Sequence, residues 1–171
     1  YSDMQAGEKQ DARRALTGWS EAGAAQAAGD WQAVQVFTAE QLPVRPELVA
    51  QQCPPVRITG EVAPIALTEP EPGTWIFDLG QNMVGWCRIR AKGAAGTTIT
   101  LRHGEMLEAD GTLYTENLRG VAQTDQFVLK GDSNEELFEP RFTFHGFRYV
   151  EVTGFPGKPT LDSLVGRVVG S

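Results

Sequence analysis

From Val56 onward the chain alternates short strand-like segments with turn signals, and this pattern constrains its fold more than any other feature. Each segment shows period-2 alternation or enrichment in β-branched and aromatic residues. The segments are VRITGEV, IALTE, TWIFDL, VGWCRIRA, TTITLRH, DQFVLK, FTFH, FRYVEVTG and LVGRVV. Turn signals such as Glu71-Pro72-Gly73, Asp110-Gly111 and Pro156-Gly157 separate them, and no amphipathic helix intervenes. The pattern predicts an all-β fold, an antiparallel jelly-roll-like β-sandwich.

The alternation also predicts which side chains share a face of a strand. Side chains two residues apart point to the same side of a sheet. One face of TWIFDL should therefore carry Trp75, Phe77 and Leu79. In FRYVEV the same rule puts Phe147 and Tyr149 on one face and Val150 and Val152 on the other. A strand with apolar residues on both faces is expected in the middle of the sheet.

The composition changes near residue 50 and predicts a boundary there. Residues 1–50 are rich in Ala, Gln and Gly, and we expect them to form an irregular segment, either a linker or the end of a preceding domain. Within it, EKQDARRAL has the propensity for one short helix, and VQVFT (Val34 to Thr38) is a β-like run. Residues 51–171 are predicted to be the β-sandwich domain.

The charge pattern excludes some partners. There are 22 acidic and 15 basic residues, giving a net charge of -7, and the basic residues are scattered singly. Nucleic acids and anionic membranes need concentrated positive charge, so neither is an expected partner. No apolar run approaches the roughly 20 residues of a membrane span, so we expect a soluble protein, whose compartment the sequence does not indicate.

The two cysteines and two histidines give no recognised catalytic or metal motif. Cys53 and Cys87 cannot form a metal cluster alone, and whether they pair stays open. His103 and His145 occur without a G-x-S-x-G nucleophile motif and without HExxH spacing. The alternative interpretation is that each imidazole is half-buried and bonded to backbone. Gly146 would then bend the strand, with Phe142, Phe144, Phe147 and Tyr149 packed on either side.

The longest gap between predicted strands, residues 104–124, gathers carboxylates. Glycoside hydrolysis usually needs a pair of them across a cleft. The candidates in or beside the gap are Glu105, Glu108, Asp110, Glu116 and Asp125. The simpler interpretation is that Asp110-Gly111 makes a turn and the glutamates are solvated. A calcium ion held by loop oxygens is also open, although no D-x-D-x-D spacing supports it.

GQNMVGW, residues 80–86, places a polar pair between two glycines and beside an aromatic residue. Gln81, Asn82 and Trp86 resemble the equipment of a sugar-binding surface, in which amides bind hydroxyls and a ring stacks on the sugar. Equally, Asn82 can cap a turn that the glycines allow between the two flanking strands.

Four segments, taken in order, resemble the accessory β-sandwich region of bacterial α-L-rhamnosidases. They are FDLGQNMVGW, LRHGEMLEADGTLYTENLR, TDQFVLKG and EPRFTFHGFRYVEVTGFPG, and the likeness runs from about Val56 to Ser171. GEKQDAR, followed by GW and DW, is similar to the end of the preceding domain in that family. The resemblance implies a concanavalin- or lectin-like sandwich without catalytic residues, because the general acid and base belong to a separate (α/α)6 toroid.

The resemblance gives the 104–124 loop another role. Tyr114, Glu116, Asn117 and Arg119 are types favoured at interfaces, and they are expected to pack on the neighbouring catalytic domain. Three functions follow as alternatives. The first is a structural module of an α-L-rhamnosidase, with the catalytic domain of the same parent chain as its partner. The second is a carbohydrate-binding module for L-rhamnose or a rhamnoside, and the third is an autonomous enzyme.

Overall fold

The computed structural model describes residues 1–16, 18–22, 31–38, 40–42, 44 and 47–171. The chain divides into two compact units. One comprises Tyr1–Arg14 together with Val56–Ser171, and the other comprises Ala15–Pro55. The described residues of the second unit contain turns but no strand or helix. The predicted β-like run at Val34 to Thr38 is therefore wrong: Val34 is 84% exposed and no strand pairs with this segment.

The regular secondary structure of the first unit is almost wholly β-strand. The strands are β1 (Ser2–Asp3), β2 (Gly7–Asp11), β3 (Arg57–Val62), β4 (Ala66–Glu71), β5 (Thr74–Ala91), β6 (Thr98–Gly104), β7 (Met106–Leu107), β8 (Leu113–Tyr114), β9 (Thr124–Val128), β10 (Glu136–Phe138), β11 (His145–Thr153) and β12 (Leu164–Gly170). Three single-turn 3-10 helices complete it, η1 (Ala12–Arg14), η3 (Glu116–Leu118) and η4 (Leu161–Ser163).

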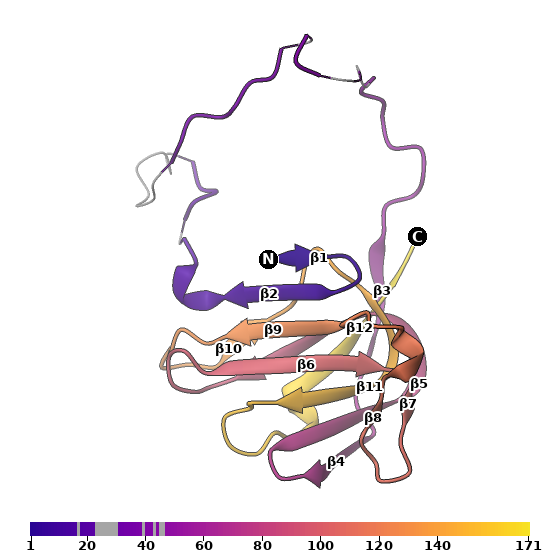
Figure 1. Ribbon diagram of the computed structural model, residues 1–171. Helices are drawn as coiled ribbons and strands as arrows, with labels where there is room; N and C mark the ends of the chain where they lie inside the picture. Colours follow the sequence, from indigo (N-terminus) through magenta and orange to yellow (C-terminus); the bar gives the residue numbers. More distant parts are fainter. Residues whose placement is uncertain (17, 23–30, 39, 43, 45–46) are drawn as a thin grey trace. The chain divides into compact units, whose positions relative to one another are not determined.

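Ten of these strands form one curled sheet, and β7 and β8 form a separate hairpin. The order is β1-β2-β9-β6-β11-β5-β12-β3, with β4 and β10 also paired to β5. All pairs are antiparallel except β2 with β9. Figure 1 shows the sheet curling, with β9, β6 and β11 side by side. The predicted all-β sandwich is confirmed.

The core lies inside the curl and is made by residues from most of the strands. Trp75, Phe77 and Leu79 all belong to it, as the alternation in TWIFDL predicts. Ile99, Leu101, Phe127, Phe138 and Leu164 join them from β6, β9, β10 and β12. Burial of such side chains contributes about 1.5–3 kcal/mol each, so this cluster is the main source of the unit's stability.

A register irregularity in β11 changes the predicted faces of FRYVEV. Phe147 pairs with Met83 of β5, but Tyr149 pairs with Asp78, so between these two pairs one residue of β11 lies opposite four of β5. The period-2 rule fails across this bulge. Phe147 consequently joins Val150 and Val152 in the core, whereas Tyr149 lies outside it, and the predicted grouping of Phe147 with Tyr149 is wrong. The strand's central place, between β5 and β6, is confirmed.

The irregularity also shows that Gly146 is not the bend that the sequence indicates. Gly146 lacks a positive φ, and the shift in register falls after it, between Phe147 and Tyr149. Only part of the predicted aromatic packing exists, because Phe142 is 71% and Phe144 47% exposed. Both precede the first residue of β11, and the expected FTFH strand is absent.

GQNMVGW does not separate two strands. It lies within β5, which continues through it as one strand of 18 residues. Gly80 has a φ of 76°, a left-handed conformation that favours glycine, and Asp78 Oδ1 accepts its N–H at 2.7 Å. Residues before the segment pair with β4, and residues from Gly85 onward pair with β12 and then β10, while β11 pairs with residues before and within the segment. The segment is thus the place where β5 changes partners.

The N-terminal residues belong to the sheet. Lys9, Gln10 and Asp11 of β2 pair in parallel with Gln126, Phe127 and Val128 of β9. The predicted helix over EKQDARRAL is wrong, because the strand pairing of residues 7–11 outweighs helix propensity and leaves only the short η1. The sequence predicts that all of residues 1–50 lie outside the sandwich domain. Tyr1–Arg14 instead belong to the same compact unit as Val56–Ser171.

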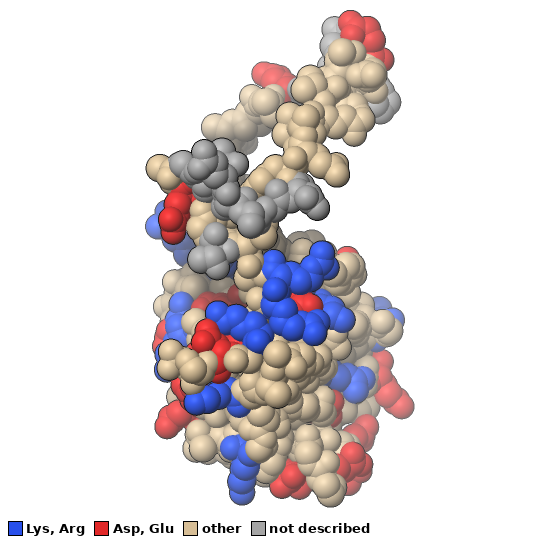
Figure 2. Space-filling model, turned by 90° about the vertical axis from the view of Figure 1, so that its left-hand side faces the viewer, with Lys and Arg blue, Asp and Glu red and all other residues tan. Residues whose placement is uncertain are grey.

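Charges of both signs lie together on the surface of this unit. On the face in Figure 2, Lys and Arg gather in a band with carboxylates among them. Arg13 with Asp11 at 2.7 Å and Lys130 with Asp132 at 2.8 Å are two of the pairs formed. No helix in the described part of the chain has the length and apolar character to cross a membrane.

Candidate functional site

The most unusual feature of the interior is a cluster of three polar side chains, His103, Asp125 and His145. They come from β6, β9 and β11 and are buried, with side chains 0% exposed. The two imidazole rings stack with centroids 4.2 Å apart. Asp125 Oδ2 lies 3.2 Å from His145 Nε2 and 3.9 Å from His103 Nε2. The sequence predicts half-buried imidazoles bonded to backbone, but both are fully buried. The imidazole of His145 also bonds to a side chain, that of Asp125, rather than to backbone.

Backbone groups fix two members of the cluster. Asp125 Oδ1 accepts the N–H of Glu8 at 2.8 Å. The carbonyl oxygen of Gln123 lies 3.0 Å from both the backbone nitrogen and Nδ1 of His103. Gln123 has a φ of 42°, and a residue other than glycine in this region signals local strain. The strained turn directs a carbonyl at His103.

The cluster perturbs the protonation of its members. Burial lowers the pKa of His103 to about 4, assisted by the neighbouring His145, so its imidazole is neutral at pH 7. The pKa of Asp125 is lowered: burial acts to raise it, but the hydrogen bond with His145, the proximity of both imidazoles and the N–H of Glu8 outweigh that effect. Asp125 is therefore a carboxylate at pH 7. His103 Nε2 and His145 Nδ1 have no hydrogen-bond partner among the described residues.

A pocket of about 400 Å³ lies next to this cluster. Met4, Gln5, Glu105, Asn117, Leu118, Val121, Gln123, Phe144, His145 and Gly146 line it. At its edge Glu105 accepts a hydrogen bond from Asn82 Nδ2 at 2.7 Å and one from Asn117 Nδ2 at 3.5 Å. Two residues from different predicted groups, Asn82 of the sugar-binding set and Asn117 of the interface set, thus meet on one carboxylate.

The other two members of the predicted sugar-binding set lie elsewhere. Gln81 is exposed and does not line this pocket. Trp86 is half-buried, and its indole Nε1 donates to Glu139 Oε1 at 2.9 Å. Arg167 Nε donates to the same oxygen at 3.0 Å. The indole N–H of Trp86 is therefore engaged with Glu139, whereas the side-chain amide of Asn82 is engaged with Glu105.

The predicted interface residues are at the surface, around the short helix η3. Glu116, Asn117 and Arg119 are exposed and Tyr114 is half-buried, while Leu118 between them is buried and anchors the turn. Arg119 has a φ of 51°. The geometry presents polar side chains outward on an anchored loop.

The predicted carboxylates do not form an opposed pair. Asp110 Oδ1 accepts from the N–H and hydroxyl of Thr112, at 3.0 and 2.7 Å, as its interpretation as a turn requires. Glu108 and Glu116 are exposed. In the described part of the chain, His103, Asp125 and His145 are the one group of three or more His, Cys, Asp or Glu side chains whose ligand atoms converge. Sequence reasoning named each residue but had no signal that joins them.

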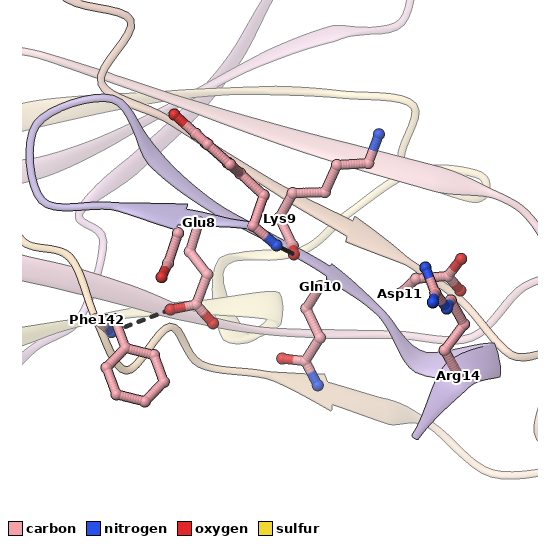
Figure 3. A pocket seen from close by; sticks show the side chains of 8 residues that line it. Glu8, Lys9, Gln10, Asp11, Arg14 and Phe142 are labelled. Atoms are coloured by element: carbon pink, nitrogen blue, oxygen red, sulfur yellow. Dashed lines mark hydrogen bonds between the residues drawn. The ribbon is translucent and has the colours of Figure 1, made fainter. Parts of the chain in front are cut away.

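A second pocket, of about 660 Å³, lies beside the N-terminal strands and was not indicated by the sequence. Tyr1, Ser2, Glu8, Lys9, Gln10, Asp11, Arg14 and Phe142 line it. Figure 3 shows the Glu8 carboxylate reaching the backbone of Phe142, a hydrogen bond of 3.0 Å. Cys53 and Cys87 are both free thiols, one exposed and one buried.

Comparison with known proteins agrees with this architecture, a concanavalin-like β-sandwich. Residues 68–170 match the family model described as the bacterial alpha-L-rhamnosidase concanavalin-like domain. An alpha-L-rhamnosidase of Streptomyces avermitilis is 52% identical over 168 residues, which is 98% of this chain and 16% of that protein. The chain belongs to the family of bacterial α-L-rhamnosidase concanavalin-like domains.

Solved structures give the same result. The crystal structure of the Streptomyces avermitilis alpha-L-rhamnosidase complexed with L-rhamnose matches with a TM-score of 0.90 and 51% identity, over 99% of this chain and 16% of that one. The alpha-L-rhamnosidase from Dictyoglumus thermophilum matches with a TM-score of 0.81 and 37% identity, over 99% of this chain and 18% of that one. The chain therefore spans less than a fifth of these relatives.

Proposed function

We propose that this domain is a non-catalytic support within an α-L-rhamnosidase. Its partner is an (α/α)6 catalytic domain of the same parent chain, which hydrolyses terminal α-L-rhamnosides. The observation that carries the proposal is the sequence identity of 52% to the Streptomyces enzyme. The match covers 98% of this chain but only 16% of that enzyme's length. A supporting role also fits a sandwich whose predicted loop carboxylates, apart from the buried Asp125, are turn-forming or solvent-exposed.

The contact surface in this proposal is the loop around η3. Asn117 and Arg119 are exposed, on a turn anchored by buried Leu118, and exposed Arg and Asn side chains on such a turn suit a polar domain contact. Changing both to alanine removes the contact without removing a core residue. In the full-length parent, Asn117→Ala with Arg119→Ala should lower the thermal midpoint and lower kcat/KM for p-nitrophenyl α-L-rhamnoside.

The control is Lys92→Ala with Glu135→Ala, a second pair of exposed residues outside the η3 loop. This control should leave both quantities unchanged. The isolated chain should release no p-nitrophenol above the uncatalysed rate. Unchanged stability and kinetics in the Asn117 and Arg119 variant would refute the contact surface, and turnover by the isolated chain would refute the supporting role.

A second candidate function, holding L-rhamnose or a rhamnoside, is favoured by the pocket beside Glu105. Its rim combines one carboxylate with the amides of Asn82 and Asn117, groups that bind sugar hydroxyls. Calorimetric titration with L-rhamnose, with and without calcium, tests it. Saturable binding that Asn82→Ala abolishes and Trp86→Phe retains would support the pocket. Absence of heat at millimolar sugar would eliminate this candidate.

A further inference from the structure

The buried cluster of His103, Asp125 and His145 has the composition and spacing of a metal site. One ligand atom from each of the three residues lies within 4.8 Å of the other two. The two histidines are the only ones among the 171 residues of the sequence. We propose that these three side chains bind one divalent transition-metal ion of the zinc type, independently of any glycosidase activity of the parent.

The first argument is geometric. Tetrahedral zinc holds nitrogen and oxygen ligands at about 2.0 to 2.2 Å, which puts neighbouring ligand atoms about 3.3 to 3.6 Å apart. Asp125 Oδ2 is 3.2 Å from His145 Nε2 and 3.9 Å from His103 Nε2. For these two contacts with Asp125, an ion between the atoms requires displacements of only a few tenths of an ångström, and the ligand atoms of the two histidines start within 4.8 Å of each other.

The second argument is the orientation of His103. A carbonyl oxygen only accepts hydrogen bonds, so the contact of Gln123 O with Nδ1 at 3.0 Å places the proton of the neutral imidazole on Nδ1. The lone pair is then on Nε2, which is buried, lies near the Asp125 carboxylate and has no partner among the described residues. A cation between these two groups satisfies both. Metal-bound histidines commonly donate their other N–H to a backbone carbonyl.

The third argument is the support of the carboxylate. Asp125 Oδ1 is occupied by the N–H of Glu8 at 2.8 Å, which leaves Oδ2 directed at both imidazoles. Two imidazoles and one carboxylate form a ligand set that suits Zn²⁺, Co²⁺ or Ni²⁺, whereas Ca²⁺ and Mg²⁺ prefer oxygen ligands only. The ion would tie β6, β9 and β11 together.

The experiment uses the 171-residue chain refolded from urea with EDTA, with one equivalent of ZnCl2, or with one equivalent of CoCl2. Refolding with the metal present is needed because the site is buried. We expect a higher thermal midpoint with zinc, saturating at one equivalent, and visible cobalt bands of a low-symmetry site. In the wild-type chain, zinc should also shift the imidazole nitrogen resonances of both histidines, a readout that needs no variant.

Variants distinguish this site from adventitious binding. His103→Gln and His145→Gln should each weaken zinc binding at least tenfold, whereas Cys53→Ser, which removes the exposed thiol, should leave it unchanged. An unchanged midpoint with unshifted imidazole resonances at excess zinc would overturn the proposal. Zinc binding lost in Cys53→Ser, or kept in both histidine variants, would overturn it as well.

Discussion

The backbone N–H of Glu8 donates to Oδ1 of Asp125 at 2.8 Å, although 117 residues separate the two in the chain. The side chain of Glu8 makes a further link, because its Oε2 accepts the N–H groups of Arg141 and Phe142 at 2.9 and 3.0 Å. One residue of β2 thus fastens the N-terminal segment to β9 and to the segment before β11. This arrangement makes residues 1–14 part of the sandwich.

Glu8→Ala should destabilise the chain by about 1–3 kcal/mol, since it leaves two partly buried N–H groups without their acceptor. Glu8→Gln should cost less, because the amide oxygen still accepts. Urea unfolding at pH 7 measures the difference. Glu135→Ala, at an exposed position, is the matched control and should change stability by no more than about 0.5 kcal/mol. Equal values for Glu8→Ala and the control would contradict this role.

Two phenylalanines five residues apart should differ sharply in their importance. Phe147 is 0% exposed and its ring contacts that of His103 edge-on, with centroids 4.7 Å apart, whereas Phe142 is 71% exposed. Phe147→Ala should cost about 3–5 kcal/mol, a large part of a typical domain stability of about 5–15 kcal/mol. Phe142→Ala should stay within about 0.5 kcal/mol. Similar midpoints for the two variants in chemical denaturation would show that Phe147 is not a core residue.

Two glycines should respond oppositely to alanine. Gly7 has a φ of 117°, and a Cβ there would lie 2.1 Å from the carbonyl oxygen of Thr124. Gly146 has no atom within 4 Å of the corresponding position and no positive φ. Gly7→Ala should therefore lower the thermal midpoint by several degrees, while Gly146→Ala should leave it unchanged or raise it slightly. A large drop in the thermal midpoint of Gly146→Ala would support the original hypothesis that Gly146 bends the strand.

The ion pair between Arg148 and Asp78 should make stability depend on pH in acid. Nε and Nη2 of Arg148 donate to the carboxylate at 2.8 and 2.9 Å, and with the Gly80 N–H they lower the pKa of Asp78 below its ordinary 3.8. The unfolded chain then binds the proton first as pH falls. The contribution is complete above pH 3.8 and is lost as pH falls through the lower folded-state pKa.

Because Arg148 is 37% exposed, solvent screening limits this contribution to less than about 1 kcal/mol. The stability difference between wild type and Asp78→Asn should be largest near neutral pH and should shrink below pH 3.8. Arg148→Met should show the same trend. Thermal unfolding from pH 2 to 7 measures it, and a constant difference across this range would rule out the ion pair as its source.

The sequence by itself determined the class of fold and part of the core. Alternating apolar residues and turn signals are local properties, so the all-β class and the inward face of Trp75, Phe77 and Leu79 followed from them. The resemblance of four segments likewise indicated the family to which the chain belongs. The Asp110 turn was predictable for the same reason, since its hydrogen bonds reach only two residues along the chain.

Tertiary structure decided everything that depends on pairing between distant segments. The parallel pairing of β2 with β9 overrode helix propensity in residues 7–11. The bulge between Phe147 and Tyr149 arises from the pairing of β11 with β5. It could not be predicted from the alternation of residues in β11 alone. His103, Asp125 and His145 have no motif spacing, and only the adjacency of β6 to both β9 and β11 brings them together, because a sheet's strand order is set by its whole core.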